Sequence, residues 1–440
     1  MNRRIIVDTG PLARVEGEGS LLIEMDGKRV VNVQLKIFEP PRYYEAFLRG
    51  RKVEEVVDMV PRICGICPVA YQISALNAIE GLFGVEVPSG AKTLRALLYL
   101  GEWIESHALH VFMLAAPDYF GVPDCFALYR REPELVKQAL RLKQLGNRLM
   151  AVIGGREVHP VSLRIGGVHK LPHETSLKEV RANLKSSLEF AMKAVALISR
   201  LEAPHLARKV TYVALRSDDG YAFLDGDVMT SDGARITPSR FEEEFVERQV
   251  GYSNSLRSLT KDGRPYMVGP LARVNMNFDR LSPSAAEVAE KVGLAPMEDD
   301  PFKSMLARAV ELVHACEETV RLIGEYDGNI RPHVPYEYKE GTGYGVSEAP
   351  RGVLYHRYEV DRKGQVLQAK IVPPTAQNQM RIEEDVRLLM PKVIRAGTDR
   401  VRRLSEMAVR NYDPCISCAT HFLKVNIVRR LRGDDRARLQ

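Results

Sequence analysis

Apolar residues recur at helical spacing over most of the chain. From Pro68 onward, apolar side chains return every three or four positions, which places them on one face of a helix. The same periodicity predicts further helical stretches at residues 91–116, 133–153, 176–203, 301–326 and 380–412. These stretches are long and apolar enough to pack against one another, so the pattern favours a predominantly α-helical protein with a core of long helices.

Alternating apolar and polar residues predict β-structure in shorter segments. The first 40 residues alternate on either side of Asp26-Gly27, a strong signal for a hairpin turn. A second hairpin is predicted through Asp361–Gly364, and an irregular β excursion at about residues 209–277, which are rich in Gly, Asp, Ser and Tyr. No internal repeat or low-complexity linker divides the chain. We therefore expect an α+β fold in which residues 1–440 form one domain, a long-helix bundle with peripheral β-hairpins.

Composition and charge narrow the class of protein. With 440 residues, 45% of them hydrophobic and 27% charged, the chain can build a large core. The net charge is +6, and +4 of it lies in the last 19 residues, so the charge does not favour nucleic-acid binding. No run of 18 apolar residues predicts a membrane span, and the apolar run after Arg3-Arg4 is too short for a signal peptide. A cytoplasmic location is expected unless a partner carries the targeting signal.

The cysteines contain the clearest chemical pattern. Six cysteines are too few for a disulfide scaffold, yet four of them form two Cys-x-x-Cys pairs. The pairs are Cys64/Cys67 and Cys415/Cys418, whereas Cys125 and Cys316 are single and predicted to be buried, inert thiols. A proline suited to the first helical position follows the first pair, and Asp413-Pro414 ends the last long helix before the second. Both pairs are thus predicted at helix ends, where four thiolates can converge.

The spacing of the pairs leaves the metal open. Four thiolates suit zinc, nickel or an iron–sulfur cluster, and two independent thiol pairs without a metal are an alternative. Structural zinc sites usually have their second pair about 15–20 residues after the first, whereas 347 residues separate Cys67 from Cys415. A thioredoxin-like dithiol needs a βαβ setting, which neither pair has. The residues therefore predict a four-thiolate metal centre without identifying its metal.

The segments around the pairs resemble a known family. "RICGICP" and "DPCISC" are accompanied, in the family's order, by "RVEGEG", "WIESHALH", "APDYFG", "GREVHP", "RIGGVHK", "GPLARVN", "EAPRG" and "PTAQN". Together these motifs resemble the large, catalytic subunit of [NiFe]-hydrogenases and span Arg14 to His421. The short length is more similar to the cytoplasmic, cofactor-coupled enzymes than to the membrane-bound uptake enzymes. The resemblance implies the large-subunit fold and reversible oxidation of H2.

The resemblance also implies a role for each cysteine. In the family, the four thiolates hold nickel, and the second cysteine of each pair also binds an iron that carries CO and two cyanides. By position, Cys67 and Cys418 would bridge the metals, and Cys64 and Cys415 would be terminal nickel ligands. Heterolytic cleavage of H2 requires a base beside the metals, and Cys415 is implied to be that base. Glu16 in "RVEGEG" matches the glutamate that relays the proton.

Further residues are implied to surround the two metals. Arg351 in "EAPRG" matches a guanidinium above the open site, with Asp118 and Asp413 as its expected carboxylate partners. A buried arginine needs such pairing. Thr375 and the backbone near Pro350 match positions that contact the iron's diatomic ligands, for which a hydroxyl supplies a hydrogen-bond donor. These assignments follow from the resemblance and not from spacing.

A separate Mg2+ (or Fe) site near the C-terminus is also implied. Glu45 and His421 match its ligands, and His421 lies three residues after Cys418. The remaining histidines in matched motifs, His107, His110 and His159, are expected to play structural roles.

The chain departs from the family pattern at two places. Many members have a histidine where this chain has Tyr71, which can donate a hydrogen bond to a bridging sulfur but cannot act as an imidazole. Family precursors are commonly cleaved just after the histidine matching His421, whereas here residues 422–440 continue as a tail. The sequence leaves open whether this tail is removed.

Electron transfer is expected to need partner subunits. No cysteines remain for an iron–sulfur relay, so the resemblance implies a small subunit carrying the clusters and further diaphorase or electron-transfer subunits. No Rossmann G-x-G-x-x-G follows a strand, which places the site of a nicotinamide, deazaflavin, ferredoxin or disulfide-reducing acceptor elsewhere. Two alternatives are a non-catalytic scaffold with a four-cysteine zinc site and a complex I-like quinone-binding relative. The latter generally lacks the four cysteines.

Overall fold

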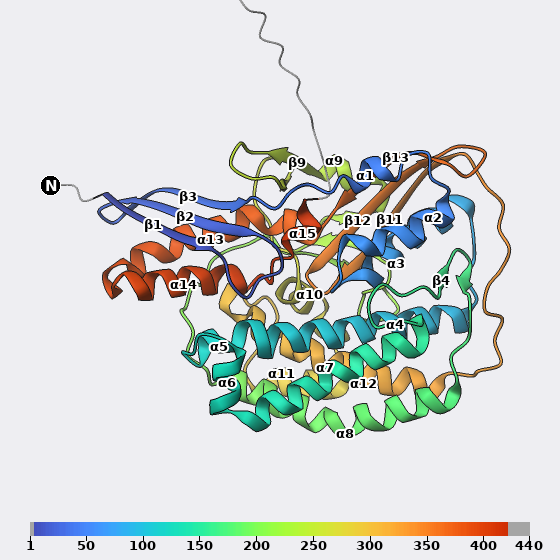
Figure 1. Ribbon diagram of the computed structural model, residues 1–440, viewed down its shortest axis with the longest axis horizontal. Coiled ribbons are helices and arrows are strands. Elements are labelled where there is room, and N and C mark those ends of the chain that lie inside the picture. Colours follow the sequence, from blue (N-terminus) through green and yellow to red (C-terminus); the bar gives the residue numbers. More distant parts are fainter. Residues whose placement is uncertain (1–3, 421–440) are drawn as a thin grey trace, which may run out of the picture.

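Four long helices form the lower half of the molecule (Figure 1). They are α4 (Ser89–Ala108), α7 (Pro133–Gly154), α8 (Glu174–Ile198) and α12 (Ser304–Glu325) in a computed structural model that describes residues 4–420. Helix α4 packs on α7 and α12, and nearly all of its second half is buried. The predicted long-helix core is confirmed.

Helices α4 and α7 approach each other at a pair of glycines. A Cβ atom on Gly146 of α7 would lie 2.6 Å from the carbonyl oxygen of Gly101 on α4 and 2.6 Å from the amide nitrogen of Glu105. Glycine is therefore required for the close approach of the two backbones, and not for an unusual φ angle.

A second layer joins α3 (Pro68–Phe83) to an antiparallel sheet. The sheet has the order β11 (Gly341–Ala349), β12 (Gly352–Val360) and β13 (Val366–Val372). The predicted hairpin is β12–β13, and Gly364 donates to the carbonyl of Asp361 in its turn. Strand β11 was not predicted, because its glycines interrupt the alternation of apolar and polar residues. A Cβ on Gly343 or Gly345 would collide with carbonyl oxygens of α3, so these glycines let the helix lie on the sheet.

The N-terminal β-structure is confirmed as a three-stranded sheet. Strands β1 (Arg4–Pro11), β2 (Gly19–Asp26) and β3 (Arg29–Ile37) pair in sequence order, and β2 alternates strictly between buried and partly buried residues. The turn has Gly27 at φ +59°, the left-handed region that glycine adopts most readily. Helix α13 (Pro374–Val393) packs against β3, and a Glu383 oxygen accepts from the amide of Leu35 at 2.6 Å.

The predicted β excursion is only partly β. It contains a three-stranded sheet and a hairpin, but residues 270–277 form a helix. The strands are β6 (Val213–Arg216), β7 (Asp227–Thr230), β8 (Arg235–Ile236), β9 (Phe245–Gln249) and β10 (Leu256–Thr260), and the helix is α10 (Pro270–Asn277). Short connecting elements include α1 (Tyr44–Phe47), α2 (Val53–Met59), α5 (Ala116–Tyr119), α6 (Cys125–Arg131), β4 (Leu163–Arg164), β5 (Gly167–Val168), α9 (Phe241–Glu244) and α11 (Pro283–Lys291).

Two predicted helices change character along their length. The helix expected at 91–116 is α-helical to Ala108 and widens to a π-helix at Leu109–Ala115. The stretch at 380–412 is divided into α13, which contains Pro391 in its last turn, and α14 (Thr398–Arg410). Gly397, at φ +88°, allows the change of direction between them. Among residues 4–420, no helix is long and apolar enough to cross a membrane.

Candidate metal centre

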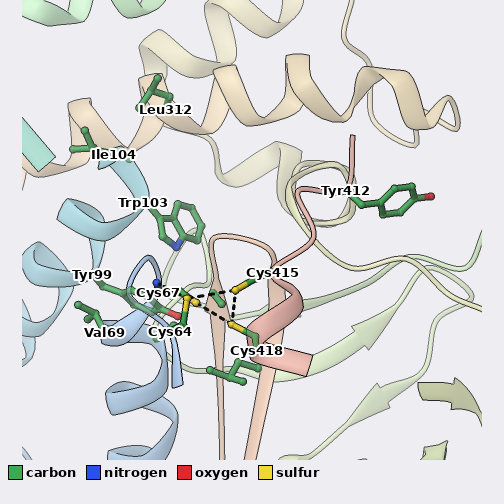
Figure 2. Packing of buried hydrophobic residues seen from close by; sticks show 14 of the residues in the cluster. Cys64, Cys67, Val69, Tyr99, Trp103, Ile104, Leu312, Tyr412, Cys415 and Cys418 are labelled. Carbon is green, nitrogen blue, oxygen red and sulfur yellow. Dashed lines mark hydrogen bonds between the residues drawn. The ribbon is translucent and has the colours of Figure 1, made fainter. Parts of the chain in front are cut away.

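The two cysteine pairs meet inside the protein, although they lie at opposite ends of the chain. The Sγ atoms are 3.4 Å apart for Cys64 and Cys415, 3.6 Å for Cys67 and Cys418, and 2.7 Å for Cys415 and Cys418. Each cysteine is at most 3% exposed. Figure 2 shows the four sulfur atoms facing one another, with the ring of Trp103 close by. The predicted convergence is confirmed, and the four residues form a group that could hold a metal ion.

Helix α3 positions the first pair. Cys67 is the residue before its first turn, and the amides of Ile66 and Cys67 donate to the Cys64 sulfur at 3.3 Å. The buried carboxylate of Glu102 accepts from the amides of Val69 and Ala70, at 2.6 and 3.2 Å. These bonds satisfy donors at the start of α3 that have no partner within the helix. The pattern of residues around Glu102 gives no sign of this role.

The second pair is held by the N-terminal loop that carries "RVEGEG". The amide of Ile416, at the start of α15 (Ile416–Ala419), donates to the carbonyl of Glu16 at 2.9 Å. The Glu16 carboxylate lies 3.1 Å from Cys415 Sγ and also accepts from the Ser417 amide at 3.0 Å. Glu16 is therefore a neighbour of the sulfur centre and not a carboxylate on a remote turn.

Arg42 connects the segments that carry the two pairs. Its Nη2 donates to the carbonyl of Ile63 at 2.5 Å and to that of Ser417 at 2.7 Å, and its amide donates to Thr420 at 2.8 Å. Ile63 precedes the first pair, and Ser417 lies within the second. One guanidinium thus fixes the distance between them, a role that no motif around Arg42 predicts.

The environment of the cluster changes the acidity of the thiols. Burial raises the pKa of the Cys67, Cys415 and Cys418 thiols, and at Cys415 the neighbouring sulfurs raise it further. Burial also acts on Cys64, but hydrogen bonds from the other thiols and the charge of Arg351 outweigh it, so its pKa falls below the usual value. Negative charge in the cluster therefore collects first at Cys64. Full deprotonation requires a cation among the sulfurs.

Arg351 lies beside the sulfurs and is paired with Asp413. Its Nε donates to the Asp413 carbonyl at 2.8 Å, and its Nη2 donates to the Asp413 carboxylate at 3.2 Å. Burial opposes the charge of Arg351, but Asp413 and the sulfurs of Cys415, Cys67 and Cys64 outweigh it and raise its pKa above the usual value. Its buried Nη1 has no hydrogen-bond partner among the described residues. One donor thus remains for a group at the sulfur centre.

The predicted pairing of Arg351 with Asp118 is wrong. Asp118 accepts from Arg410 at 2.6 and 2.9 Å and from Arg14 at 2.5 Å, so both of its oxygens have arginine partners. Arg14 and Arg410 are close because the N-terminal loop lies against the end of α14, a contact that sequence spacing does not reveal. Asp118 ties this loop to α14, and within residues 4–420 the carboxylate that pairs with Arg351 is that of Asp413.

A second buried arginine stands behind Asp413. Arg308 of α12 approaches the Asp413 carboxylate at 3.1 Å, and its Nη1 also faces the Pro350 carbonyl at 3.3 Å. Pro350 accepts as well from Arg273, at 3.0 Å. Two guanidiniums therefore hold the backbone that leads into Arg351. Pro350 contributes its carbonyl to this structural network.

His107 lies inside the same network. Its Nε2 is 3.1 Å from a Glu311 oxygen, and its Nδ1 is 3.3 Å from Arg308 Nη1. Burial lowers the pKa of His107 to about 4, so the ring is neutral and bridges a carboxylate and a guanidinium. His110 binds the Arg410 carbonyl at 2.8 Å, and His159 binds that of Pro61 at 2.8 Å. These contacts agree with the structural roles expected for the three histidines.

Thr375 and Tyr71 complete the surroundings of the sulfurs. The Thr375 hydroxyl accepts from the Cys415 amide at 2.9 Å and so positions that residue. Tyr71, one turn into α3, is buried, and its hydroxyl has no hydrogen-bond partner among the described residues. Burial and the nearby Cys418, Cys67 and Cys415 raise its pKa well above the usual value. The centroids of the Tyr71 and His356 rings are 5.6 Å apart. His356 Nδ1 in turn lies 2.7 Å from the Tyr358 hydroxyl, to which it is hydrogen-bonded.

The predicted Mg2+ site is described only in part. An oxygen of Glu45 accepts from the Ile371 amide at 2.9 Å and lies 3.9 Å from Lys370 Nζ. His421 and the tail 422–440 lie outside the described residues. Of the single cysteines, Cys316 is buried, and burial raises its pKa to about 12, as expected for an inert thiol. Cys125 is partly exposed, so its predicted burial is wrong.

Comparison with known proteins identifies the family. The model of the nickel-dependent hydrogenase family matches residues 42–133 and 230–421, which include all four cysteines. The chain belongs to this family. It is 36% identical over 421 residues to the alpha subunit of sulfhydrogenase 1 from Pyrococcus furiosus, covering 94% of this chain and 97% of the relative. It is 33% identical to a vhu subunit of the F420-non-reducing hydrogenase from Methanocaldococcus jannaschii, covering 87% and 97% of the two chains.

Solved structures agree with this assignment. The hydrogenase chain superposes on an NAD+-reducing [NiFe]-hydrogenase in the H2-reduced state with a TM-score of 0.86 and 30% identity, covering 95% of this chain and 99% of that one. A [NiFeSe]-hydrogenase of Dm. baculatum, at 24% identity and a TM-score of 0.77, shares the fold. The expected large-subunit fold and the assignment as a hydrogenase are confirmed. The family also favours an enzyme over a zinc scaffold or a quinone-binding relative.

Proposed function

We propose that this hydrogenase subunit oxidises H2 reversibly at a nickel–iron centre held by Cys64, Cys67, Cys415 and Cys418. The observation that carries the proposal is the placement of Glu16, whose carboxylate lies 3.1 Å from Cys415 Sγ at the edge of a buried four-sulfur cluster. A structural metal site has no need of a carboxylate beside one of its sulfurs. A site that releases protons does.

The donor set fits a nickel–iron pair. Four soft thiolates suit nickel, and the buried Nη1 of Arg351 and the Tyr71 hydroxyl offer donors that find no partner among the described protein atoms. Cys64 faces Cys415, and Cys67 faces Cys418, which supports terminal roles for the first two and bridging roles for the last two. The second metal would be iron carrying CO and two cyanides. When bound, the two metals would supply the redox and Lewis-acid chemistry that polarises H2.

The chain itself would handle the proton. Cys415 Sγ takes it, because the sulfur is beside a carboxylate that can receive it next. Glu16 Oε2 then accepts it over 3.1 Å. The burial of the four cysteines excludes bulk water, so the proton leaves through Glu16 and not by random exchange.

Arg351, Asp413, Thr375 and Pro350 would position the centre. Asp413 orients the Arg351 guanidinium, whose Nη1 would be free to donate to a ligand of the metals. Thr375 holds the Cys415 amide, and its hydroxyl hydrogen is available for a ligand of the iron. The Pro350 carbonyl anchors the Arg351 backbone through Arg273 and Arg308.

Outside the sulfur centre, we assign Glu45 and His421 to a Mg2+ (or Fe) site near the C-terminus. Electrons would pass to an iron–sulfur small subunit, then through further subunits to a soluble acceptor. The similarity to an NAD+-reducing enzyme and to sulfhydrogenase and F420-non-reducing hydrogenase subunits supports such an assembly. We place the complex in the cytoplasm, where soluble electron acceptors of this kind are found.

Infrared spectroscopy and metal analysis of the purified complex test this proposal. Nickel and iron together with bands from bound CO and cyanide are expected. Cys415→Ser should abolish H2 turnover, and Glu16→Gln should block proton exchange while both metals remain bound. Zinc alone in the native complex, or wild-type turnover by Cys415→Ser, would contradict the proposal.

A further inference from the structure

Ser417 lies between two glutamates at the sulfur centre. Its amide donates to Glu16 Oε2 at 3.0 Å, and its hydroxyl donates to Glu39 Oε1 at 2.6 Å. Ser417 is buried, whereas Glu39 is partly exposed and follows the exposed Phe38 at the end of β3. The two carboxylates thus approach neighbouring atoms of one serine, with Glu16 on the sulfur side and Glu39 toward the surface.

The N-terminal loop also brings Glu39 to the backbone beside Glu16. A Cβ atom on Gly17 would lie 2.4 Å from Glu39 Oε2, and the same oxygen accepts from the Glu18 amide at 3.1 Å. Gly17 has φ +88°, so both its conformation and its surroundings exclude a side chain. The missing side chain leaves room for the second carboxylate next to the first.

We propose that Ser417 and Glu39 carry the proton from Glu16 to the surface, which makes Glu39 the second carboxylate of the exit route. This inference rests on the proposed function of Glu16. It adds the step that Glu16 lacks, because Glu16 is only partly exposed and its Oε2 is engaged by Cys415 and Ser417.

Each transfer conserves atoms and charge. The Cys415 thiol gives its proton to the Glu16 carboxylate, which breaks an S–H bond and forms an O–H bond. Protonated Glu16 turns from the Ser417 amide to the adjacent hydroxyl and donates its proton to Oγ, while that hydroxyl passes its own hydrogen to Glu39. Glu39 then releases the proton to water, and every carboxylate returns to its initial state.

The Glu39→Gln variant tests whether Glu39 transfers a proton or only supports the local structure. In Glu39→Gln the amide oxygen can still accept from the Ser417 hydroxyl, while the NH2 group takes the place of the oxygen that accepts from the Glu18 amide. The amide side chain cannot carry the proton. In the intact complex, exchange of D2 with solvent protons should slow by about 100-fold, the low end for a positioned proton-transfer group. The infrared bands of bound CO and cyanide should stay at their wild-type positions. The carbonyl stretch of protonated Glu39, expected in difference spectra of the wild type, should be absent from the variant.

Matched variants provide the controls. Ser417→Ala should slow exchange as Glu39→Gln does, whereas Glu39→Asp should retain part of it. Glu18→Gln makes the same charge change on an exposed side chain of the same loop and should exchange like wild type. If Glu39→Gln exchanges as fast as Glu18→Gln, the inference is overturned. If the CO and cyanide bands of Glu39→Gln also shift, Glu39 has a structural role and not a role in proton transfer.

The two proposals fail in different ways. Slow exchange in Glu16→Gln with normal exchange in Glu39→Gln would overturn the exit route and leave the hydrogenase function intact. Absence of nickel and of CO and cyanide bands from wild-type protein would overturn the function itself.

Discussion

Two buried hydrogen-bond donors beside the sulfur atoms indicate where another group would bind. Arg351 Nη1 and the Tyr71 hydroxyl are both buried beside sulfur atoms, and neither has a hydrogen-bond partner among the described residues. An unpaired buried donor costs about 1–3 kcal/mol of folding free energy. Both atoms lie beside the sulfur cluster, so the metals and ligands that we propose for this site would offset the cost.

Tyr71→Phe tests this reasoning at one atom. In metal-free protein, the variant should be as stable as wild type or about 1 kcal/mol more stable, because it removes an unpaired hydroxyl. In the loaded complex, the CO and cyanide bands should move to lower wavenumber, since the bridging sulfur loses a donor and passes more electron density to iron. Urea unfolding and infrared spectra measure the two effects.

The Tyr99→Phe variant is the control for this experiment. Tyr99 is also buried, but its hydroxyl donates to Ser347 at 2.9 Å, so its removal should destabilise the metal-free protein and leave the bands in place. Loss of stability in metal-free Tyr71→Phe would show that the hydroxyl has a protein partner.

At the scale of elements, helix α4 joins the structural core to the metal centre. It packs against α7 through the contact of Gly101 with Gly146. Its second half carries Trp103 and His107, which lie against Arg273 and Arg308 behind Arg351. Displacement of α4 should therefore affect both stability and the site.

Gly146→Ala should show the cost of separating α4 from α7. The added methyl would meet two backbone atoms at 2.6 Å, so we expect a loss of about 2–3 kcal/mol despite the better helix propensity of alanine. Gly81→Ala is the matched control, because Gly81 is exposed in α3 and nothing lies within 4 Å of its Cβ position. That variant should gain up to about 1 kcal/mol. Equal urea midpoints for the two variants would contradict the close helix contact.

The pKa of His107, on the same helix, predicts how the stability of the protein depends on pH. Its folded pKa of about 4 lies below the value of about 6.5 expected in the unfolded chain, so the unfolded state binds more protons between these pH values. The contribution of neutral His107 to the free energy of unfolding is fully present above about pH 6.5. It falls by about 3 kcal/mol as the pH decreases toward 4. His107→Gln should flatten this slope in urea unfolding at several pH values. His173→Gln, at an exposed position, should keep the wild-type slope, and an equal slope in both variants would refute the assignment.

At the scale of the whole molecule, the two ends of the chain close one site. The sulfur of Cys64 meets that of Cys415, 351 positions away, and Glu16 reaches Cys415 across 399 positions. Ordering such distant segments is costly in chain entropy, so the contacts that join them must stabilise the closed form. Metal binding and folding of the two ends are therefore coupled.

Arg42→Met tests this coupling. Among the described residues, Arg42 alone donates to both cysteine segments. Its loss removes the donor to the Ile63 carbonyl and leaves the Ser417 carbonyl only the Thr420 hydroxyl, at 3.3 Å. We expect a cost of about 2 kcal/mol and faster loss of nickel to a chelator, measured by thermal unfolding and by metal release. Arg49→Met changes an exposed arginine nearby and should release nickel at the wild-type rate. Equal release from both variants would assign Arg42 no part in closing the site.

Local features of the fold were predictable from the sequence. The hairpin at Asp26-Gly27 and the long helices follow from residue spacing within one element, where neighbouring side chains decide the structure. Strand β11 was not predicted, because its glycines are required by the close packing of α3, which lies more than 250 residues earlier in the chain. The π-helix at Leu109–Ala115 likewise has no local sign in the pattern of apolar residues.

The sequence by itself identified the four candidate metal ligands, because four cysteines in two pairs have few uses, and the flanking motifs indicated one family. Only the tertiary structure decided which charges pair. Asp118 binds Arg14 and Arg410 and not Arg351, because a carboxylate pairs with whichever guanidinium the packing brings within reach. The contact of Ser417 with Glu39 spans 378 positions and was invisible for the same reason. Residue types limit which chemistry is available, and the packing of distant segments selects the partners.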